Sequence, residues 1–345
     1  MTIHFLTTQN NDLLSGIVHY NEKIAEYFIL KGYNTKTYNI TDSLTFPEED
    51  QLLQLLVEAK KNLLKDIVIA EGEVMTSFPE TIKKLAPLCK LIALVHIPQA
   101  FNPHNSVYTR EIISKLETEI LTYAHKVVTG NHYTADLLLN FFQLGSKLKV
   151  ILPGIGPTPR KTQYPESPTK IICIANFSLS SDYTTIFRSL AALKQYNWNL
   201  DCYGDTSITT EHISELKSLV KRIGLINRIH FYNYNKSELS DLLINSDLMV
   251  NPISFDSIGM IVMEALSHGI PVITTTGTGH PQFLKSSTCQ FFAPGNVYSL
   301  QCLFENLFEE PSFYKKLCHH SSQFHLQTLR WEHTINEFET IFEEL

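Results

Sequence analysis

The segment from Asn251 to Gln282 constrains the fold more than any other part of this chain of 345 residues. An apolar run, LMV, precedes it, and a polar loop, SFDS, follows that run. From Gly259 onward the apolar residues fall at helical spacing, and the β-branched run IPVITTT after Gly269 is typical of a buried strand. A strand, a helix and a second buried strand in this order predict a parallel β-sheet covered by helices.

The turn before this helix has the features of an anion-binding site. Gly259 lets the backbone approach a ligand, and the first turn of a helix presents N–H groups that have no partner within the helix. Asp256 lies in the loop and Glu264 lies in the helix, so two carboxylates flank these N–H groups. Carboxylates accept hydrogen bonds from sugar hydroxyls. The segment therefore predicts a site for a phosphorylated, hydroxyl-bearing ligand, although any parallel strand followed by an amphipathic helix shares part of the pattern.

Strands and helices alternate through both halves of the chain, which predicts an α/β fold of two Rossmann-like parallel-sheet domains. A proline-rich segment between the halves cannot form regular structure and is predicted to be a linker. The predicted parts are an N-terminal domain at 1–155, the linker at 156–168 and a C-terminal domain at 169–328. The predicted strands are 3–8, 34–40, 66–71, 91–97, 126–130, 148–153, 170–177, 199–205, 229–234 and 248–253.

Composition narrows the classes of function. The formal charge is −7, and residues 1–155 hold 14 Lys and Arg against 16 Asp and Glu, so no nucleic-acid partner is expected. No apolar run reaches the length of a membrane span and the first residues, MTIHFL, lack a basic leader, so we expect a cytoplasmic protein. Lysines among apolar residues at 51–65 and 81–90 predict peripheral membrane contact at most. The six cysteines form no CxxC pair and are expected to be free.

The segment 251–282 resembles the donor-binding signature of retaining glycosyltransferases of family 4, which have the GT-B fold of two Rossmann-like domains facing a central cleft. In those enzymes two acidic residues flank a Phe-Gly pair, and Glu-Ala, Gly-x-Pro-Val and Gly-Gly-x-Pro-Glu follow. The counterparts in this chain are Asp256, Ile258 and Gly259, Glu264 and Ala265, Gly269 to Val272, and Thr278 to Gln282. The resemblance extends to the end of the chain, where Trp331 and Glu332 match the start of a helix, 329–345, that returns to the N-terminal domain.

The resemblance implies a role for each site residue. A retaining glycosyltransferase moves a sugar from a nucleotide sugar to an acceptor, here a sugar, a polar metabolite or a lipid head group, and the family generally needs no metal or other cofactor. The implied catalytic residues are His96, which matches a histidine facing donor and acceptor, and Asp256, which would bind hydroxyls of the transferred sugar. The implied donor-binding residues are Gly16, Asn176, Ser181, Gly204, Tyr234, Gly259, Met260, Ile261 and Glu264.

The first loop of the C-terminal domain departs from the family pattern. Family members carry an Arg and a Lys that contact the donor diphosphate, and the matching residues here are Asn176 and Ser181. Two lost charge-assisted hydrogen bonds, about 1.5 to 3 kcal/mol each, would slow an unchanged mechanism by about two to four powers of ten. A GT-B-like accessory or binding subunit with weak or no turnover is therefore the main alternative, and a GT-B epimerase or phosphorylase is a third. The cations Arg160, Lys161, Lys170 and Arg188 are candidate substitutes.

A second cluster, Cys318, His319, His320 and His325, precedes the predicted final helix. Its spacing fits no standard zinc pattern. On an amphipathic helix such residues are ordinary surface and half-buried side chains, so no metal site is predicted.

Overall fold

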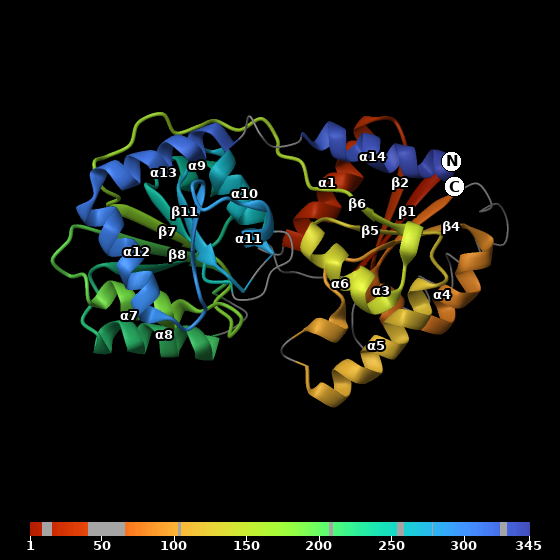
Figure 1. Ribbon diagram of the computed structural model, residues 1–345, viewed down its shortest axis with the longest axis horizontal. Coiled ribbons are helices and arrows are strands. Elements are labelled where there is room, and N and C mark those ends of the chain that lie inside the picture. Colours follow the sequence, from red (N-terminus) through yellow and green to blue (C-terminus); the bar gives the residue numbers. More distant parts are fainter. Residues whose placement is uncertain are drawn as a thin grey trace. The chain divides into compact units, whose positions relative to one another are not determined.

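The computed structural model describes residues 1–8, 16–40, 66–102, 105–206, 210–253, 259–277, 279–324 and 330–345. The chain divides into two compact units. The first unit comprises Met1–Asn11, Ile17–Gly154 and Leu329–Leu345, and the second comprises Asp12–Gly16 and Ile155–Thr328. Each unit is built on a six-stranded parallel sheet with helices packed against it (Figure 1). The predicted α/β fold with two Rossmann-like parallel sheets is therefore confirmed.

The sheet of the first unit has the strand order β2-β1-β3-β4-β5-β6. All five residues of β3 are buried, as expected for a central parallel strand covered on both faces. Only Ile40 is buried in the edge strand β2, which has the polar sequence NTKTYNI. The strands are β1 (Thr2–Thr8), β2 (Asn34–Ile40), β3 (Ile67–Glu71), β4 (Lys90–Leu94), β5 (Lys126–Thr129) and β6 (Leu148–Val150). The helices are α1 (Gly16–Leu30), α3 (Gly72–Ser77), α4 (Pro79–Leu85), η2 (Ala86–Leu88), η3 (Gln99–Phe101), α5 (Val107–Leu121), α6 (His132–Phe142), η4 (Gly145–Lys147) and α14 (Trp331–Glu344).

The last helix, α14, packs against α1 of the first unit. The rings of Phe338 and Phe342 lie 5.9 and 5.3 Å from that of Phe28. Gly154 lies against the start of α14, where a Cβ at this position would be 2.2 Å from the backbone nitrogen of Trp331. Only glycine allows this close approach of two backbones. The end of the chain is thus part of the core of the first unit.

The second unit has the strand order β12-β11-β10-β7-β8-β9. Alternate residues of β7 enter two cores: Ile171 and Cys173 pack with α7, α8 and α12, whereas Ile172 and Ile174 pack with α9 and α10. Helices therefore cover both faces of this sheet. The strands are β7 (Lys170–Ile174), β8 (Asn199–Gly204), β9 (Ile229–Asn233), β10 (Leu248–Val250), β11 (Val272–Thr275) and β12 (Cys289–Phe292). The helices are α7 (Tyr183–Ala191), α8 (Thr210–Arg222), η5 (Lys236–Glu238), α9 (Leu239–Ile244), α10 (Met260–Ser267), α11 (His280–Phe283), α12 (Val297–Glu309) and α13 (Pro311–Gln323).

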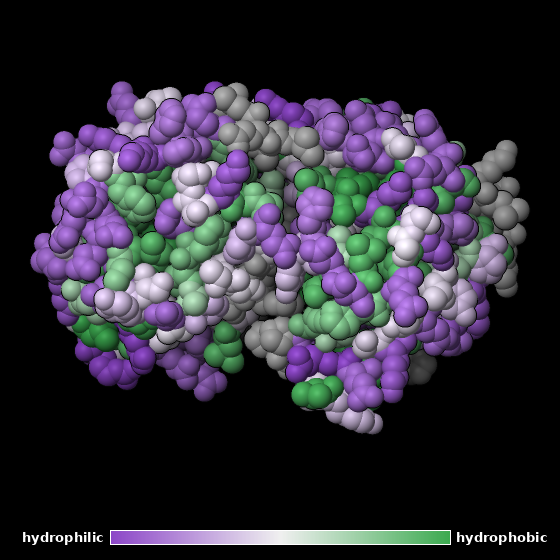
Figure 2. Space-filling model, viewed as in Figure 1, coloured by the Kyte–Doolittle hydropathy of each residue, from purple (hydrophilic) through white to green (hydrophobic). Residues whose placement is uncertain are grey.

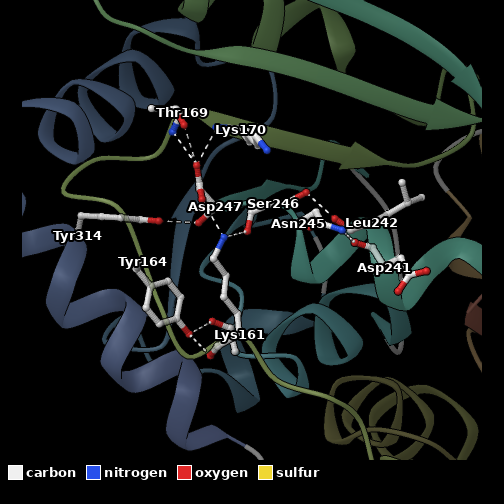
Figure 3. Close-up of polar contacts among 11 residues, drawn as sticks. Lys161, Tyr164, Thr169, Lys170, Asp241, Leu242, Asn245, Ser246, Asp247 and Tyr314 are labelled. Atoms are coloured by element: carbon white, nitrogen blue, oxygen red, sulfur yellow. Dashed lines mark hydrogen bonds and ion pairs between the residues drawn. The ribbon is translucent and has the colours of Figure 1, made fainter.

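The proline-rich segment is irregular, but it is part of the second unit and is bonded to the elements around it (Figure 3). Lys161 Nζ lies 2.8 Å from Asp247 Oδ1, and the other carboxylate oxygen accepts hydrogen bonds from the N–H and hydroxyl groups of Thr169 at 3.0 and 2.9 Å. The hydroxyl of Tyr164 donates to the carbonyl of Gly269 at 2.7 Å. These contacts connect the segment to the end of α10 and to the start of β10.

Replacing Lys161 with methionine is expected to lower the free energy of unfolding of the second unit by about 2 to 3 kcal/mol, because a buried carboxylate loses its cation. Burial alone would raise the pKa of Asp247, but Lys161 and the backbone donors hold that pKa below its ordinary value. The stability from this carboxylate is therefore present above the unfolded-state pKa and is lost as the pH falls through the folded-state pKa. Thermal unfolding near pH 7 and at a series of pH values below 3.8 measures both effects.

The matched control is Glu215→Gln, which changes the exposed hydrogen bond between Glu215 and His212 on α8. That change is expected to cost less than about 0.5 kcal/mol. Equal losses in the two variants would contradict the assigned role of the Lys161–Asp247 pair.

Within the described residues, no helix has the length and apolarity needed to cross a bilayer. Figure 2 shows hydrophilic residues over much of the visible face, with smaller areas of hydrophobic residues between them. Val107 and Tyr108, in the first turn of α5, are each 74% exposed.

Candidate functional site

The strand order of the second sheet reverses between β7 and β10, which are adjacent in the sheet. Ligands of open α/β sheets bind at the carboxyl ends of the strands at such a reversal. The loop after β7 and the loop after β10 meet there, because Ser181 forms a β-bridge with Ile253 and the N–H of Asp182 donates to the carbonyl of Pro252 at 2.9 Å. The fold therefore brings the predicted segment to the expected ligand-binding edge.

Gly259 is required at the start of α10 for two reasons. Its φ is +65°, in the left-handed region that favours glycine. A Cβ at this position would also lie 1.6 Å from Nε2 of His280, whose ring is fully buried. Nδ1 of the same ring is 3.1 Å from the hydroxyl oxygen of Thr274 on β11. His280 thus forms part of the turn, although the sequence analysis did not assign it to the site.

The first turn of α10 can receive an anion. Gly259 occupies the N-cap position and makes no side-chain capping bond. The N–H groups of Met260 and Ile261 follow, at the positive end of the helix dipole. Met260 is buried and Ile261 is half-buried. This turn has the backbone arrangement that binds phosphate oxygens in other proteins.

Three of the predicted donor-binding residues lie close together in the second unit. The N–H of Tyr234 donates to the carbonyl of Gly204 at 3.0 Å, and a Cβ at Gly204 would lie 2.5 Å from the carbonyl oxygen of Ala175. Burial, and then the negative charge of Glu264, raises the pKa of the Tyr234 phenol. The phenol therefore lies near the half-buried Glu264 carboxylate and remains a neutral hydrogen-bond donor.

The structure also locates the positions where the cation pair is replaced. Asn176 is half-buried in the loop after β7, and Ser181 is 5% exposed at the end of that loop. Among the candidate substitutes, Lys161 is engaged by Asp247. Lys170 begins β7 and therefore lies at the opposite edge of the sheet, and Arg188 is exposed within α7. Asp256 lies outside the described residues.

The first unit has a buried polar network at the carboxyl edge of its sheet. His96, which follows β4, is 5% exposed, and its Nε2 lies 3.1 Å from Oδ1 of Asn21 on α1. The amide nitrogen of Asn21 donates to the carboxylate of Glu71 at the end of β3. The N–H and hydroxyl groups of Thr8 donate to the other carboxylate oxygen at 2.5 and 2.9 Å. Asn21 thus connects His96 to a buried carboxylate.

The network fixes the charge and the tautomer of His96. Burial lowers the pKa of His96 to about 3, so the ring is neutral near pH 7. Since Asn21 Oδ1 is an acceptor, Nε2 carries the proton and Nδ1 is left as an acceptor. Within the described residues this buried Nδ1 has no hydrogen-bond partner. Burial also raises the pKa of Glu71 to about 7, against the opposing effect of the Thr8 donors.

Glu117 is a second buried carboxylate that the sequence analysis did not identify, because it lies on an otherwise ordinary amphipathic helix, α5. Its two oxygens accept hydrogen bonds from the N–H groups of Gln99 and Ala100 at 2.7 and 3.2 Å. Burial raises its pKa to about 7. Glu117 thereby holds the short helix η3, which follows His96 in the chain.

The structure adds less about two other features of the sequence, Gly16 and the cluster of Cys318, His319, His320 and His325. Gly16 is the first residue of α1. Cys318 is buried in α13, whereas His319 and His320 are exposed, and His325 lies outside the described residues. In the part of the chain that the structure describes, no group of three or more His, Cys, Asp or Glu side chains could hold a metal ion.

Comparisons with known proteins agree with this architecture. The family model for glycosyl transferases group 1 matches residues 156–323. The lipopolysaccharide glucosyltransferase WaaG of Escherichia coli (strain K12) is 25% identical over 75 residues, which are 22% of this chain and 20% of that protein. The chain therefore matches about a fifth of the length of this curated relative.

Two solved structures resemble the whole chain. Sucrose-phosphate synthase from Thermosynechococcus elongatus has a TM-score of 0.80 at 13% identity, covering 100% of this chain and 99% of that one. Anabaena Alr3699/HepE in complex with UDP has a TM-score of 0.79 at 14% identity, covering 100% of both chains. Residues 156–323 of this chain are thus similar to the glycosyl transferases group 1 family, and the whole chain has the GT-B fold.

Proposed function

We propose that this protein transfers a sugar from a nucleotide-sugar donor to an acceptor hydroxyl with retention of the anomeric configuration. The observation that carries the proposal is the turn at Gly259, where the first turn of α10 lies near Glu264 and Tyr234 at the ligand-binding edge of the second sheet. The Anabaena protein that shares this fold was solved with UDP and with UDP-glucose, which supports a donor of this class.

Each group of the proposed donor has a matching feature. The diphosphate would accept hydrogen bonds from the N–H groups of Gly259, Met260 and Ile261, and from Gly16 at the start of α1. Glu264 would accept hydrogen bonds from the ribose hydroxyls. In the reaction the bond between the anomeric carbon and the diphosphate breaks, the acceptor oxygen bonds to that carbon, and the acceptor proton passes to the departing phosphate.

His96 and Asp256 would act on the sugar. The neutral His96 offers Nδ1 as an acceptor for a sugar hydroxyl, because Asn21 already engages Nε2. By the family pattern, Asp256 would bind hydroxyls of the transferred sugar. We assign these two residues as the catalytic candidates.

A second function is favoured by one observation. The loop ANFSLSSD after β7 contains no Lys or Arg, and Lys161 is engaged by Asp247. A diphosphate held by N–H and hydroxyl groups alone forgoes charge-assisted bonds. A GT-B-like binding subunit that holds the nucleotide but turns it over slowly or not at all is therefore the alternative.

Glu264→Ala is expected to weaken UDP binding about tenfold to a hundredfold, the effect of losing a hydrogen bond to a charged group worth roughly 1.5 to 3 kcal/mol. Isothermal titration calorimetry with UDP measures it. Glu211→Ala, at an exposed position of α8, is the matched control and should bind UDP like the wild type.

Assays of the wild-type protein distinguish the two proposed functions. Release of glucose from UDP-glucose supports the enzyme, and binding of UDP without turnover of UDP-, GDP- or ADP-sugars supports the binding subunit. Normal UDP binding by Glu264→Ala would show that the assignment of this residue is wrong. A wild-type protein that binds none of the three nucleoside diphosphates would contradict both functions.

A further inference from the structure

A cavity of about 500 Å³ lies in the first unit, between one flank of α1 and the edge of the sheet formed by β1 and β2. Phe5 and Thr7 of β1 line it together with Thr37 and Asn39 of β2. In the sheet Phe5 is paired with Thr37 and Thr7 with Asn39, so these side chains share one face. We call this cavity the α1 groove.

The helix contributes one stripe of side chains to the α1 groove. Val18, Glu22, Ala25 and Ile29 line it at the spacing of one helical face. Ile29 is 58% exposed, although it is a large apolar residue. The wall formed by the helix therefore offers apolar surface beside a carboxylate.

One end of the α1 groove reaches the network that holds His96. Thr8, Asn21 and Glu71 line this end. Asn21 hydrogen-bonds to both Glu71 and His96. Thr8 and Glu71 lie at the carboxyl ends of β1 and β3, where the strand order of the first sheet reverses, and Asn21 lies on α1. A molecule in the groove would thus lie against the residues that orient the candidate catalytic histidine.

The chemistry of the described lining selects against anions. It includes the hydroxyls of Thr7 and Thr37 and the amide of Asn39, but no Lys, Arg or His. The charge of Glu26 is compensated by Lys23, whose Nζ lies 2.7 Å from the carboxylate, and Glu71 already accepts three hydrogen bonds. A phosphate would find no cation, whereas an uncharged molecule with many hydroxyls would find donors, acceptors and an apolar wall.

We propose that the α1 groove binds an uncharged saccharide, and that the acceptor of the proposed transfer is therefore a sugar rather than a phosphate-bearing head group. The assignment of the acceptor rests on the proposed function, because it places the reacting acceptor hydroxyl at the polar end of the groove, beside His96. The volume is within the range of sites for small molecules and suits a mono- or disaccharide.

Two adjacent residues of β2 provide the test. Thr37 and Lys36 are both exposed, and successive side chains of a strand point to opposite faces. Thr37→Trp would fill the α1 groove, whereas Lys36→Trp would place the same ring on the other face of the strand. Tryptophan is favourable in strands, so both variants of the full chain are expected to fold.

Saturation-transfer NMR on the wild type and both variants would use methyl glucosides, galactosides and mannosides, the corresponding disaccharides, and glycerol 3-phosphate, each with UDP present. We expect at least one uncharged saccharide to bind the wild type and Lys36→Trp alike and to bind Thr37→Trp at least about tenfold more weakly. UDP should bind all three proteins equally.

Three results would overturn the inference: saccharide binding that is the same in both variants, no uncharged saccharide bound by a wild type that binds UDP, or glycerol 3-phosphate bound in preference to every saccharide. A wild type that does not bind UDP would contradict the proposed function and the acceptor role. Sensitivity of saccharide binding to Thr37→Trp would then still establish the groove as a saccharide site.

Discussion

Gly259→Ala is expected to abolish measurable UDP binding and to lower the free energy of unfolding of the second unit by about 2 to 5 kcal/mol. An alanine at φ +65° costs about 1 to 2 kcal/mol of backbone strain. Its Cβ would also lie 1.6 Å from Nε2 of the buried His280 ring, and such overpacking costs about 1 to 3 kcal/mol. Relief of the collision requires movement of the turn that carries the N–H groups of Met260 and Ile261. Chemical denaturation and calorimetry with UDP measure the two effects.

Gly295→Ala is the matched control for backbone strain. Gly295 also has a positive φ, +77°, but a Cβ added there would have no neighbouring atom within 4 Å. The control should therefore lose only about 1 to 2 kcal/mol and keep its affinity for UDP. In the double variant Gly259→Ala with His280→Ala, the collision is removed and part of the lost stability should return. Unchanged UDP binding by Gly259→Ala would refute the role assigned to this turn.

The turn at Gly259 shows what the sequence could reveal of the site and what it could not. The need for glycine and the helical spacing after it are local properties, so the start of α10 was predicted correctly. His280 was missed because its contact with Gly259 joins the loops after β10 and β11, which meet only in the folded sheet. No periodicity within either segment encodes that contact.

Glu71 illustrates the same limit in the first unit. Its position at the end of a predicted strand was correct, but the sequence was equally compatible with an exposed strand end. The structure buries it to 4% exposure because Thr8 from β1 and Asn21 from α1 supply its donors. Such a donor set comes from separate elements and depends on their arrangement in the sheet.

Most strands were predicted closely, but the last one was missed. The predicted range 34–40 coincides with β2, and the predicted ranges 126–130 and 199–205 each exceed the observed strand by one residue. The sequence predicted no element at β12, because four residues are too few for a periodic pattern to be distinguished. Short elements such as this form because neighbouring strands supply most of their contacts.

The two units provide complementary groups through the same topology. In each sheet the strand order reverses once; Gly259 follows β10 and Glu71 ends β3 at that reversal, and His96 follows β4, the next strand of the first sheet. The second unit presents N–H groups at Gly259, which suit an anion. The first unit presents the neutral His96, which suits a hydroxyl. This division matches a reaction in which one substrate is a diphosphate and the other is an alcohol.

His96→Ala is expected to reduce turnover of UDP-glucose, the first donor to be tested, by about a hundredfold to a thousandfold, while UDP binding changes less than about twofold. The His96 side chain would act on the transferred sugar of UDP-glucose. UDP lacks that sugar, so its binding should not depend on His96. Steady-state kinetics and calorimetry with UDP separate the two effects. The control is His132→Ala, at an exposed position of α6, which should leave both unchanged. Loss of UDP binding together with turnover would place His96 in nucleotide binding instead.

The variant Glu71→Gln tests whether the network orients His96. If it does, a rise in pH should increase wild-type turnover and decrease the stability that Glu71 contributes. The ionised Glu71 accepts the Asn21 amide and thereby directs Asn21 Oδ1 to His96, so wild-type turnover should rise through about pH 7, the pKa of Glu71. A raised folded-state pKa also means that the stability from Glu71 is fully present below the unfolded value of 4.5 and is lost as the pH rises through about 7. The difference in unfolding free energy between wild type and Glu71→Gln isolates this contribution. His96 and Glu117 are present in both proteins, so the effects of their titration cancel in the difference. If Glu71→Gln keeps the rise in turnover near pH 7, another group is responsible for it and Glu71 has only a structural role.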